Sequence, residues 1–85
     1  MKRQAILMER APIDKSGRPY FIRFELYAQN GKCLGAAGWY EEGDYAAKYL
    51  DEDGQPSDAA VRGACLSAGV DYGILSYVFV YIRLL

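Results

Sequence analysis

The stretch YFIRFELYAQNGKCLGAAGWY, residues 20–40, decides the fold because it reads as two β-strands joined by a tight turn. Its first part, Tyr20–Ala28, alternates with a period of two, which predicts a strand with two different faces. The face expected to be buried consists of Tyr20, Ile22, Phe24, Leu26 and Ala28. The mixed opposite face consists of Phe21, Arg23, Glu25 and Tyr27.

Asn30-Gly31 supplies the turn between the two strands. These two residues adopt positive φ angles readily, so the pair predicts a type I′ hairpin. The return strand is expected over Lys32–Tyr40. Gly35 and Gly38 interrupt it, and a glycine inside a strand indicates a bulge or a close approach of another backbone.

The segment after the hairpin has two interpretations. Glu41–Asp44 is expected to be a turn. Tyr45–Leu50 fits a short helix with Asp44 as its cap, and Tyr45 and Tyr49 would then share one face. A fourth strand fits the same residues nearly as well.

A helix is predicted over Ser57–Ala68, after a solvated loop at Asp51–Pro56. Ser57 is a natural N-cap, Asp58 complements the helix dipole, and Gly69 ends the helix. Small side chains repeat at helical spacing, so the helix is expected to lie close against a sheet. That stripe consists of Val61, Ala64, Cys65 and Ala68.

The chain ends in a strand, Ile74–Leu85, that is apolar on both faces. The aliphatic set, expected under the helix, consists of Ile74, Ser76, Val78, Val80, Ile82 and Leu84. The other set consists of Leu75, Tyr77, Phe79, Tyr81, Arg83 and Leu85. We therefore expect one α+β domain over residues 1–85, in the order β-β-β-(short element)-α-β. It would have two layers, an antiparallel sheet of 4–5 strands with the last strand central, and one main helix on one face.

The termini point to a cytoplasmic protein. Gln4–Glu9 is a short apolar run predicted to be a strand, and Arg10–Pro19 is a loop. The apolar run Ala5–Met8 is too short for a secretory signal. Ile74–Leu85 is too short for a membrane helix and is interrupted by Arg83, so no membrane contact is expected.

No motif of the sequence indicates catalysis, a metal or a cofactor. The chain contains no histidine, the commonest general base and a frequent metal ligand. Cys33 and Cys65 fit no metal spacing. Asp51–Gly54 resembles half a calcium loop, but its glycine comes too early. We expect a protein that is not an enzyme.

The aromatic set of the last strand is the candidate interaction surface, because a single helix covers only one face of the sheet. The structural alternative is that the N-terminal run or the Arg10–Pro19 loop covers it. A protein target or a homodimer is favoured over nucleic acid, since acidic loops would repel phosphate. Stacking of bases on the aromatic rings stays open as the other alternative. The candidate partner-binding residues are Tyr77, Phe79, Tyr81 and Arg83, together with Trp39, Tyr40, Glu41, Glu42 and Asp44.

Three segments together resemble small phage-encoded anti-CRISPR proteins: the hairpin FELYAQNGKCLGAAG, the helix SDAAVRGACLSAG and the strand YVFVYIRLL. The resemblance is one of size and layout. It implies an inhibitor that binds a bacterial defence complex, such as a Cas effector, in the cytoplasm of the host bacterium. An acidic surface that mimics DNA would then consist of Glu41, Glu42, Asp44, Asp51, Glu52 and Asp53.

Overall fold

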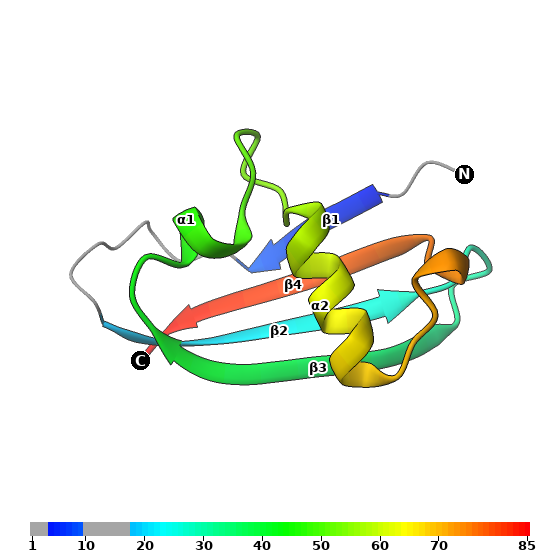
Figure 1. The fold of residues 1–85 in the computed structure, drawn as a ribbon, viewed down its shortest axis with the longest axis horizontal. Helices are drawn as coiled ribbons and strands as arrows, with labels where there is room; N and C mark the ends of the chain where they lie inside the picture. Colours follow the sequence, from blue (N-terminus) through cyan, green and yellow to red (C-terminus); the bar gives the residue numbers. More distant parts are fainter. Residues whose placement is uncertain (1–3, 10–17) are drawn as a thin grey trace.

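The computed structural model describes residues 18–85 in full and the backbone strand of residues 4–9. The domain is α+β, as the sequence predicts (Figure 1). Its elements are β1 (Gln4–Glu9), β2 (Pro19–Tyr27), β3 (Cys33–Glu42), α1 (Tyr45–Tyr49), α2 (Asp58–Ala68), the 3-10 turn η1 (Tyr72–Ile74) and β4 (Tyr77–Leu84).

The four described strands form one sheet in the order β1-β4-β2-β3. β4 is antiparallel to β2, and β2 is antiparallel to β3, but β1 is parallel to β4. The expectation of a wholly antiparallel sheet is therefore wrong at β1. The last strand occupies a central position, as predicted, by inserting between β1 and β2. These two strands run in opposite directions, so a strand between them must be parallel to one of them.

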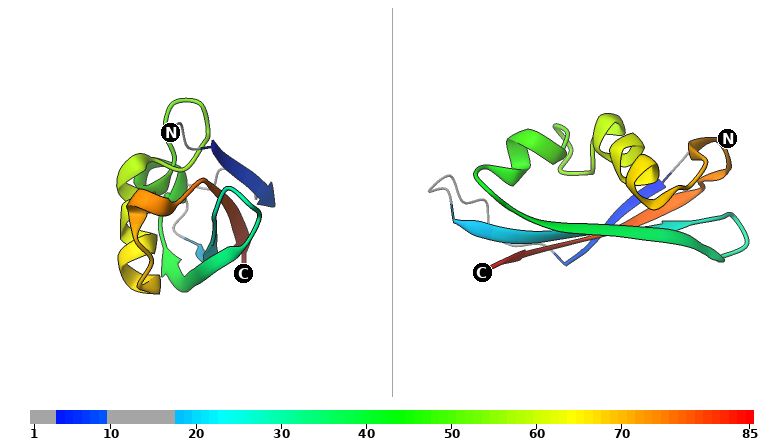
Figure 2. Two further views of the ribbon diagram at one scale, coloured as in Figure 1. Left: turned by 90° about the vertical axis from the view of Figure 1, so that its right-hand side faces the viewer. Right: turned by 60° about the horizontal axis from the view of Figure 1, so that its bottom comes forward.

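Both helices lie on the same side of the sheet (Figure 2). The segment that was ambiguous in the sequence is the helix α1, in which Asp44 Oδ1 accepts hydrogen bonds from the backbone N–H groups of Ala46 (3.1 Å) and Ala47 (3.3 Å). The predicted single main helix thus has a short companion. The expected turn at Glu41–Asp44 is shorter than predicted, because Glu41 and Glu42 still belong to β3. Only Gly43, at φ +113°, and the cap residue Asp44 connect β3 to α1.

The β2–β3 hairpin is present, but its turn is not type I′. Gly31 has φ +87°, whereas no residue other than glycine has a positive φ among those described, so Asn30 does not adopt the required conformation. Instead the N–H of Gly31 bonds to Ala28 O (3.0 Å) and the N–H of Ala28 bonds to Lys32 O (2.9 Å). This is the pattern of a three-residue loop that ends in a left-handed glycine.

The two glycines of β3 mark close approaches, as the sequence predicts. A Cβ built on Gly35 would lie 2.9 Å from Val70 Cγ2, just after α2. Gly38 lies on the side of the sheet away from the helices, where a Cβ built on it would lie 3.0 Å from Phe21 Cζ. The strand also carries a bulge, since the register shifts between Leu26 and Tyr27.

Helix α2 begins and ends at the predicted residues. Ser57 Oγ accepts from the N–H of Ala60 (3.2 Å), and Gly69 ends the helix at φ +69°. Its small stripe faces the sheet: Ala64 and Cys65 are buried, and Ala68 is half-buried.

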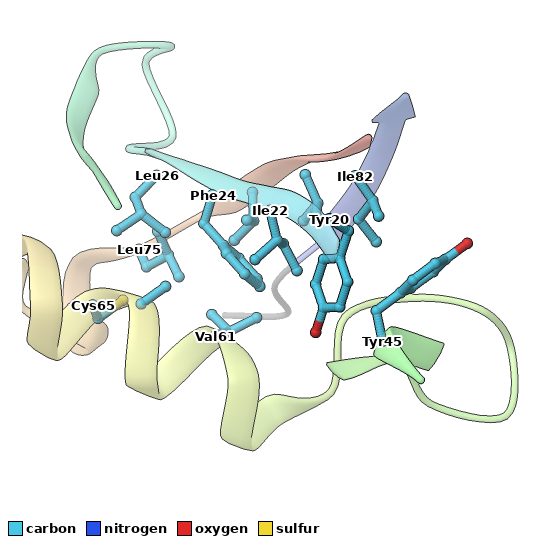
Figure 3. Packing of buried hydrophobic residues seen from close by; sticks show 12 residues of the cluster. Tyr20, Ile22, Phe24, Leu26, Tyr45, Val61, Cys65, Leu75 and Ile82 are labelled. Atoms are coloured by element: carbon cyan, nitrogen blue, oxygen red, sulfur yellow. The ribbon is translucent and has the colours of Figure 1, made fainter. Parts of the chain in front are cut away.

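The core lies between the helices and the sheet (Figure 3). Its members are Tyr20, Ile22, Phe24, Leu26, Tyr45, Val61, Ala64, Cys65, Leu75, Val78, Val80 and Ile82. One expectation is wrong at the start of the last strand: Leu75 is buried, and Ile74 is 58 % exposed. The reason is η1, which turns the chain before β4 begins at Tyr77 and so breaks the period of two.

Candidate protein-interaction site

The side of the sheet opposite the helices carries the candidate site, which we call the open face. It consists of Phe21, Arg23, Glu25 and Tyr27 of β2, Ala36, Gly38, Tyr40 and Glu42 of β3, and Tyr77, Phe79, Tyr81 and Arg83 of β4. No helix covers it within residues 4–9 and 18–85 (Figure 2). β1 pairs with the edge of β4 and therefore extends the sheet. The alternative of a covering loop falls on residues 10–17, which lie outside the described residues.

Three aromatic rings support one another at the hairpin end of the open face. Tyr27 and Tyr77 are cross-strand neighbours whose rings stack at 5.0 Å and 4°. Phe79 meets both edge-on, with centroids 5.1 Å from Tyr27 and 5.4 Å from Tyr77. Because each ring is half-buried by the others, the cluster is ordered although nothing described lies above it.

A polar chain runs beside this cluster along β2. Arg23 Nη2 lies 3.2 Å from Glu25 Oε2, and the hydroxyl of Tyr27 donates to Glu25 Oε1 at 2.9 Å. This hydrogen bond to Glu25, with a further contribution from burial, raises the pKa of Tyr27 to about 12. Glu25 therefore holds one ion pair and one hydrogen bond within the open face.

A hollow of about 240 Å³ opens at the middle of the open face. It is lined by Phe21, Arg23, Glu25, Tyr81 and Arg83. Aromatic walls with arginines at the rim are typical of the centre of a protein interface.

Tyr40 extends the open face onto β3. It is 72 % exposed, and its ring packs against Phe21 at 5.1 Å. Phe21 in turn leans over Gly38, where a side chain would collide with it. Tyr40 therefore joins the predicted residues of β4 on one continuous surface.

Trp39, by contrast, lies on the helix side and is not part of that surface. Its ring stacks on Phe24 (5.7 Å, 10°), and its Nε1 donates to the hydroxyl of Tyr49 at 3.1 Å. Trp39 and Tyr40, both predicted to bind a partner, therefore do not share one surface, because successive residues of a strand point to opposite faces.

Glu41 also lies on the helix side, where it holds α1 to the sheet. It accepts hydrogen bonds from Tyr20 OH (2.9 Å), from Lys48 Nζ (2.6 Å) and from the hydroxyl of Tyr49. Burial by itself would raise the pKa of Glu41, but these donors lower it to about 2. Burial and the hydrogen bond to Glu41 raise the pKa of Tyr20 and of Tyr49. Glu41, predicted to bind a partner, thus makes its contacts within the chain and connects α1 to the sheet.

Two other acidic side chains of this region also serve the fold. Asp44 caps α1. Asp51 Oδ1 accepts from the N–H groups of Asp53 (2.9 Å) and Gln55 (3.0 Å) and so fixes the loop. Glu42 is exposed on the open face. Glu42 therefore lies on the opposite side of the sheet from Glu41.

Sequence reasoning missed the polar contacts that order both faces. The bond from Tyr20 to Glu41 follows from the register of the hairpin, in which these two residues are directly opposite each other. Counting outward from the turn could have found the pair. The contacts of Tyr49 and Lys48 with Glu41 depend on where α1 lies, which no local pattern indicates.

No group of three or more His, Cys, Asp or Glu side chains among the described residues is arranged to hold a metal ion. None of the described helices has the length and apolar character needed to cross a membrane. No protein-family model matches the sequence, and comparison with curated proteins and with solved structures gives no significant match.

Proposed function

We propose that this chain is a small binding protein, not an enzyme, whose open face covers part of a larger protein. The observation that carries the proposal is the ordered aromatic surface of Tyr77, Phe79 and Tyr81, with no described element above it. These three rings are half-buried and join the exposed Tyr40 on one side of the sheet, and contiguous apolar surfaces of this kind are uncommon on monomers that bind nothing. The resemblance in size and layout to anti-CRISPR proteins gives the target class: a bacterial defence complex, such as a Cas effector, in the host cytoplasm.

Steric covering is favoured over mimicry of DNA. Mimicry requires a field of free carboxylates, and Glu41, Asp44 and Asp51 are each engaged within the chain. The open face also carries Arg23 and Arg83. A target site that binds DNA phosphates is positively charged and would repel these two arginines.

The test is retention of purified Cas effector complexes on the immobilised protein. The double variant Tyr77→Ser, Tyr81→Ser removes two rings of the open face and should abolish retention. Its matched control is Leu66→Ser, which removes an apolar side chain that is 85 % exposed on α2, on the helix side of the sheet. The control should retain the complexes as the unchanged chain does. Equal loss in both variants, or no retention of any complex by the unchanged chain, would contradict the proposal.

Nucleic acid is the second candidate, supported by the position of Arg23 and Arg83 beside the aromatic hollow. The ring geometry disfavours it, because Tyr27 and Tyr77 cover one face of each other and leave fewer ring faces for bases. Fluorescence anisotropy with single-stranded DNA and RNA oligonucleotides decides between the candidates. Binding to nucleic acid should weaken steeply between about 50 and 200 mM salt, whereas an aromatic protein interface should change little.

A further inference from the structure

The outer edge of β3 presents a row of backbone groups that no described strand pairs with. The carbonyls of Pro19 and Tyr27 accept from Leu85 and Ser76, which flank β4. The odd-numbered residues of β2 therefore direct their backbone groups to β4, and the even-numbered ones direct theirs to β3. Phe24 lies opposite Ala37, so Ala37 bonds inward to β2. The backbone N–H and C=O groups of the even-numbered residues of β3 point away from β2, towards solvent. These residues are Ala36, Gly38, Tyr40 and Glu42.

This edge lacks the lysine and proline that often prevent pairing with another strand, and its protective features are the inward-pointing Glu41 and a bulge near Leu34. Natural edge strands are protected by lysine, proline, inward-pointing charges or short length. β3 is ten residues long, CLGAAGWYEE, and contains no basic residue and no proline. Ala36 and Gly38 are small, so another backbone can approach them closely. The bulge near Leu34 limits the regular ladder to the residues that follow it.

We propose that β3 pairs with β3 of a second copy of this chain, antiparallel, so that the two sheets become one. An antiparallel edge is complementary to itself, because the same donors and acceptors face each other across a two-fold axis. With the axis at Gly38, the small Ala36 of one copy lies opposite the large Tyr40 of the other. Glu42 of one copy then lies beside the bulge of the other copy and not opposite the other Glu42, so the acidic ends of the two strands do not repel each other.

The two surfaces of the protein serve different partners in this arrangement. Pairing through the β3 edge lies in the plane of the sheet, so the open face of each copy stays available. The dimer would present two target-binding faces side by side. This inference concerns self-association and does not depend on the identity of any target.

Two adjacent alanines provide the test. Ala36→Pro removes an N–H group that points away from β2, so the fold should persist. The dissociation constant of the dimer should rise by at least about tenfold. In Ala37→Pro the lost N–H bonds to β2, so the fold itself should be destabilised. Sedimentation equilibrium over a range of concentrations measures the dimer, and circular dichroism measures the fold. Ala36→Lys adds a charge at the same edge without a backbone change, and it should also give a monomer.

Three results would overturn the inference. One is an unchanged chain that stays monomeric up to millimolar concentration. Another is a dimer that survives both Ala36→Pro and Ala36→Lys. The third is a dimer that is lost instead in the double variant Tyr77→Ser, Tyr81→Ser, which would place self-association on the open face. Since target retention is measured separately, failure of the edge and failure of the open face are distinguishable.

Discussion

At the scale of single residues, Glu41 joins three parts of the molecule through one carboxylate. Glu41 itself belongs to β3, its partner Tyr20 belongs to β2, and its partners Lys48 and Tyr49 belong to α1. α1 has only five residues, and a helix this short is not stable by itself. Its position therefore depends on the buried Tyr45 and on the hydrogen bonds to Glu41.

The low pKa of Glu41 leads us to expect that the free energy of unfolding falls in acid. Its pKa is about 2 in the folded chain, well below the ordinary glutamate value of 4.5 that applies to the unfolded chain, so the carboxylate favours folding at pH values above 4.5. This contribution should disappear as the pH falls from 4.5 to 2. Glu41→Gln should lower the free energy of unfolding at pH 7 by about 1–3 kcal/mol and reduce its dependence on pH in that window. Urea titrations at several pH values measure both effects. Equal acid sensitivity in the variant would assign the effect to other carboxylates.

Gly31 is the residue on which the hairpin turn depends. Its φ of +87° is unfavourable for a β-branched side chain. Gly31→Val should therefore lower the free energy of unfolding by about 1–2 kcal/mol. Asn30→Ala is the matched control, because Asn30 lacks a positive φ and loses only its bond to the N–H of Lys32. A smaller effect at Gly31 than at Asn30 in urea titration would contradict this account.

At the scale of elements, α2 packs closely because its inner stripe is small. Gly35 of β3 lies directly beneath the end of this helix, where Ala68 and Val70 fill the place of a side chain. The outer side of α2 carries Leu66, which is 85 % exposed. The two sides of the helix should therefore respond differently to a change in volume.

Ala64→Leu tests which side of α2 faces the core. Ala64 is fully buried, so three additional carbons should overpack the core and cost about 1–3 kcal/mol of stability. Leu66→Ala, on the outer side, should change stability by less than about 0.5 kcal/mol. Thermal or urea unfolding of the two variants gives the comparison. A neutral Ala64→Leu would mean that the helix is rotated relative to the sheet.

At the scale of the whole molecule, the helices occupy one side of the sheet and leave the open face on the other. A two-layer domain of this size has a single core, here on the helix side. The aromatic residues of β2 and β4 therefore cover each other across the strands instead of being covered by a third layer. The surface proposed to bind a target and the edge proposed to bind a second copy are consequences of this one-sided architecture.

The sequence by itself determined the local elements of this protein. Alternation identified the buried residues of β2, the capping residues Ser57 and Gly69 delimited α2, and the apolar character of both faces placed β4 in the centre. These signals are local, because strand period and helix caps depend on neighbours in the chain. They also located the aromatic residues of the open face on β4.

Only the tertiary structure decided how those elements combine. The parallel pairing of β1 with β4 joins opposite ends of the chain, and no local pattern encodes it. The contacts of Glu41 with Lys48 and Tyr49 depend on the place of α1 above β3. The unpaired edge of β3 likewise follows from strand order. Such features arise from contacts between residues far apart in sequence, whose energies are set by the complete packing.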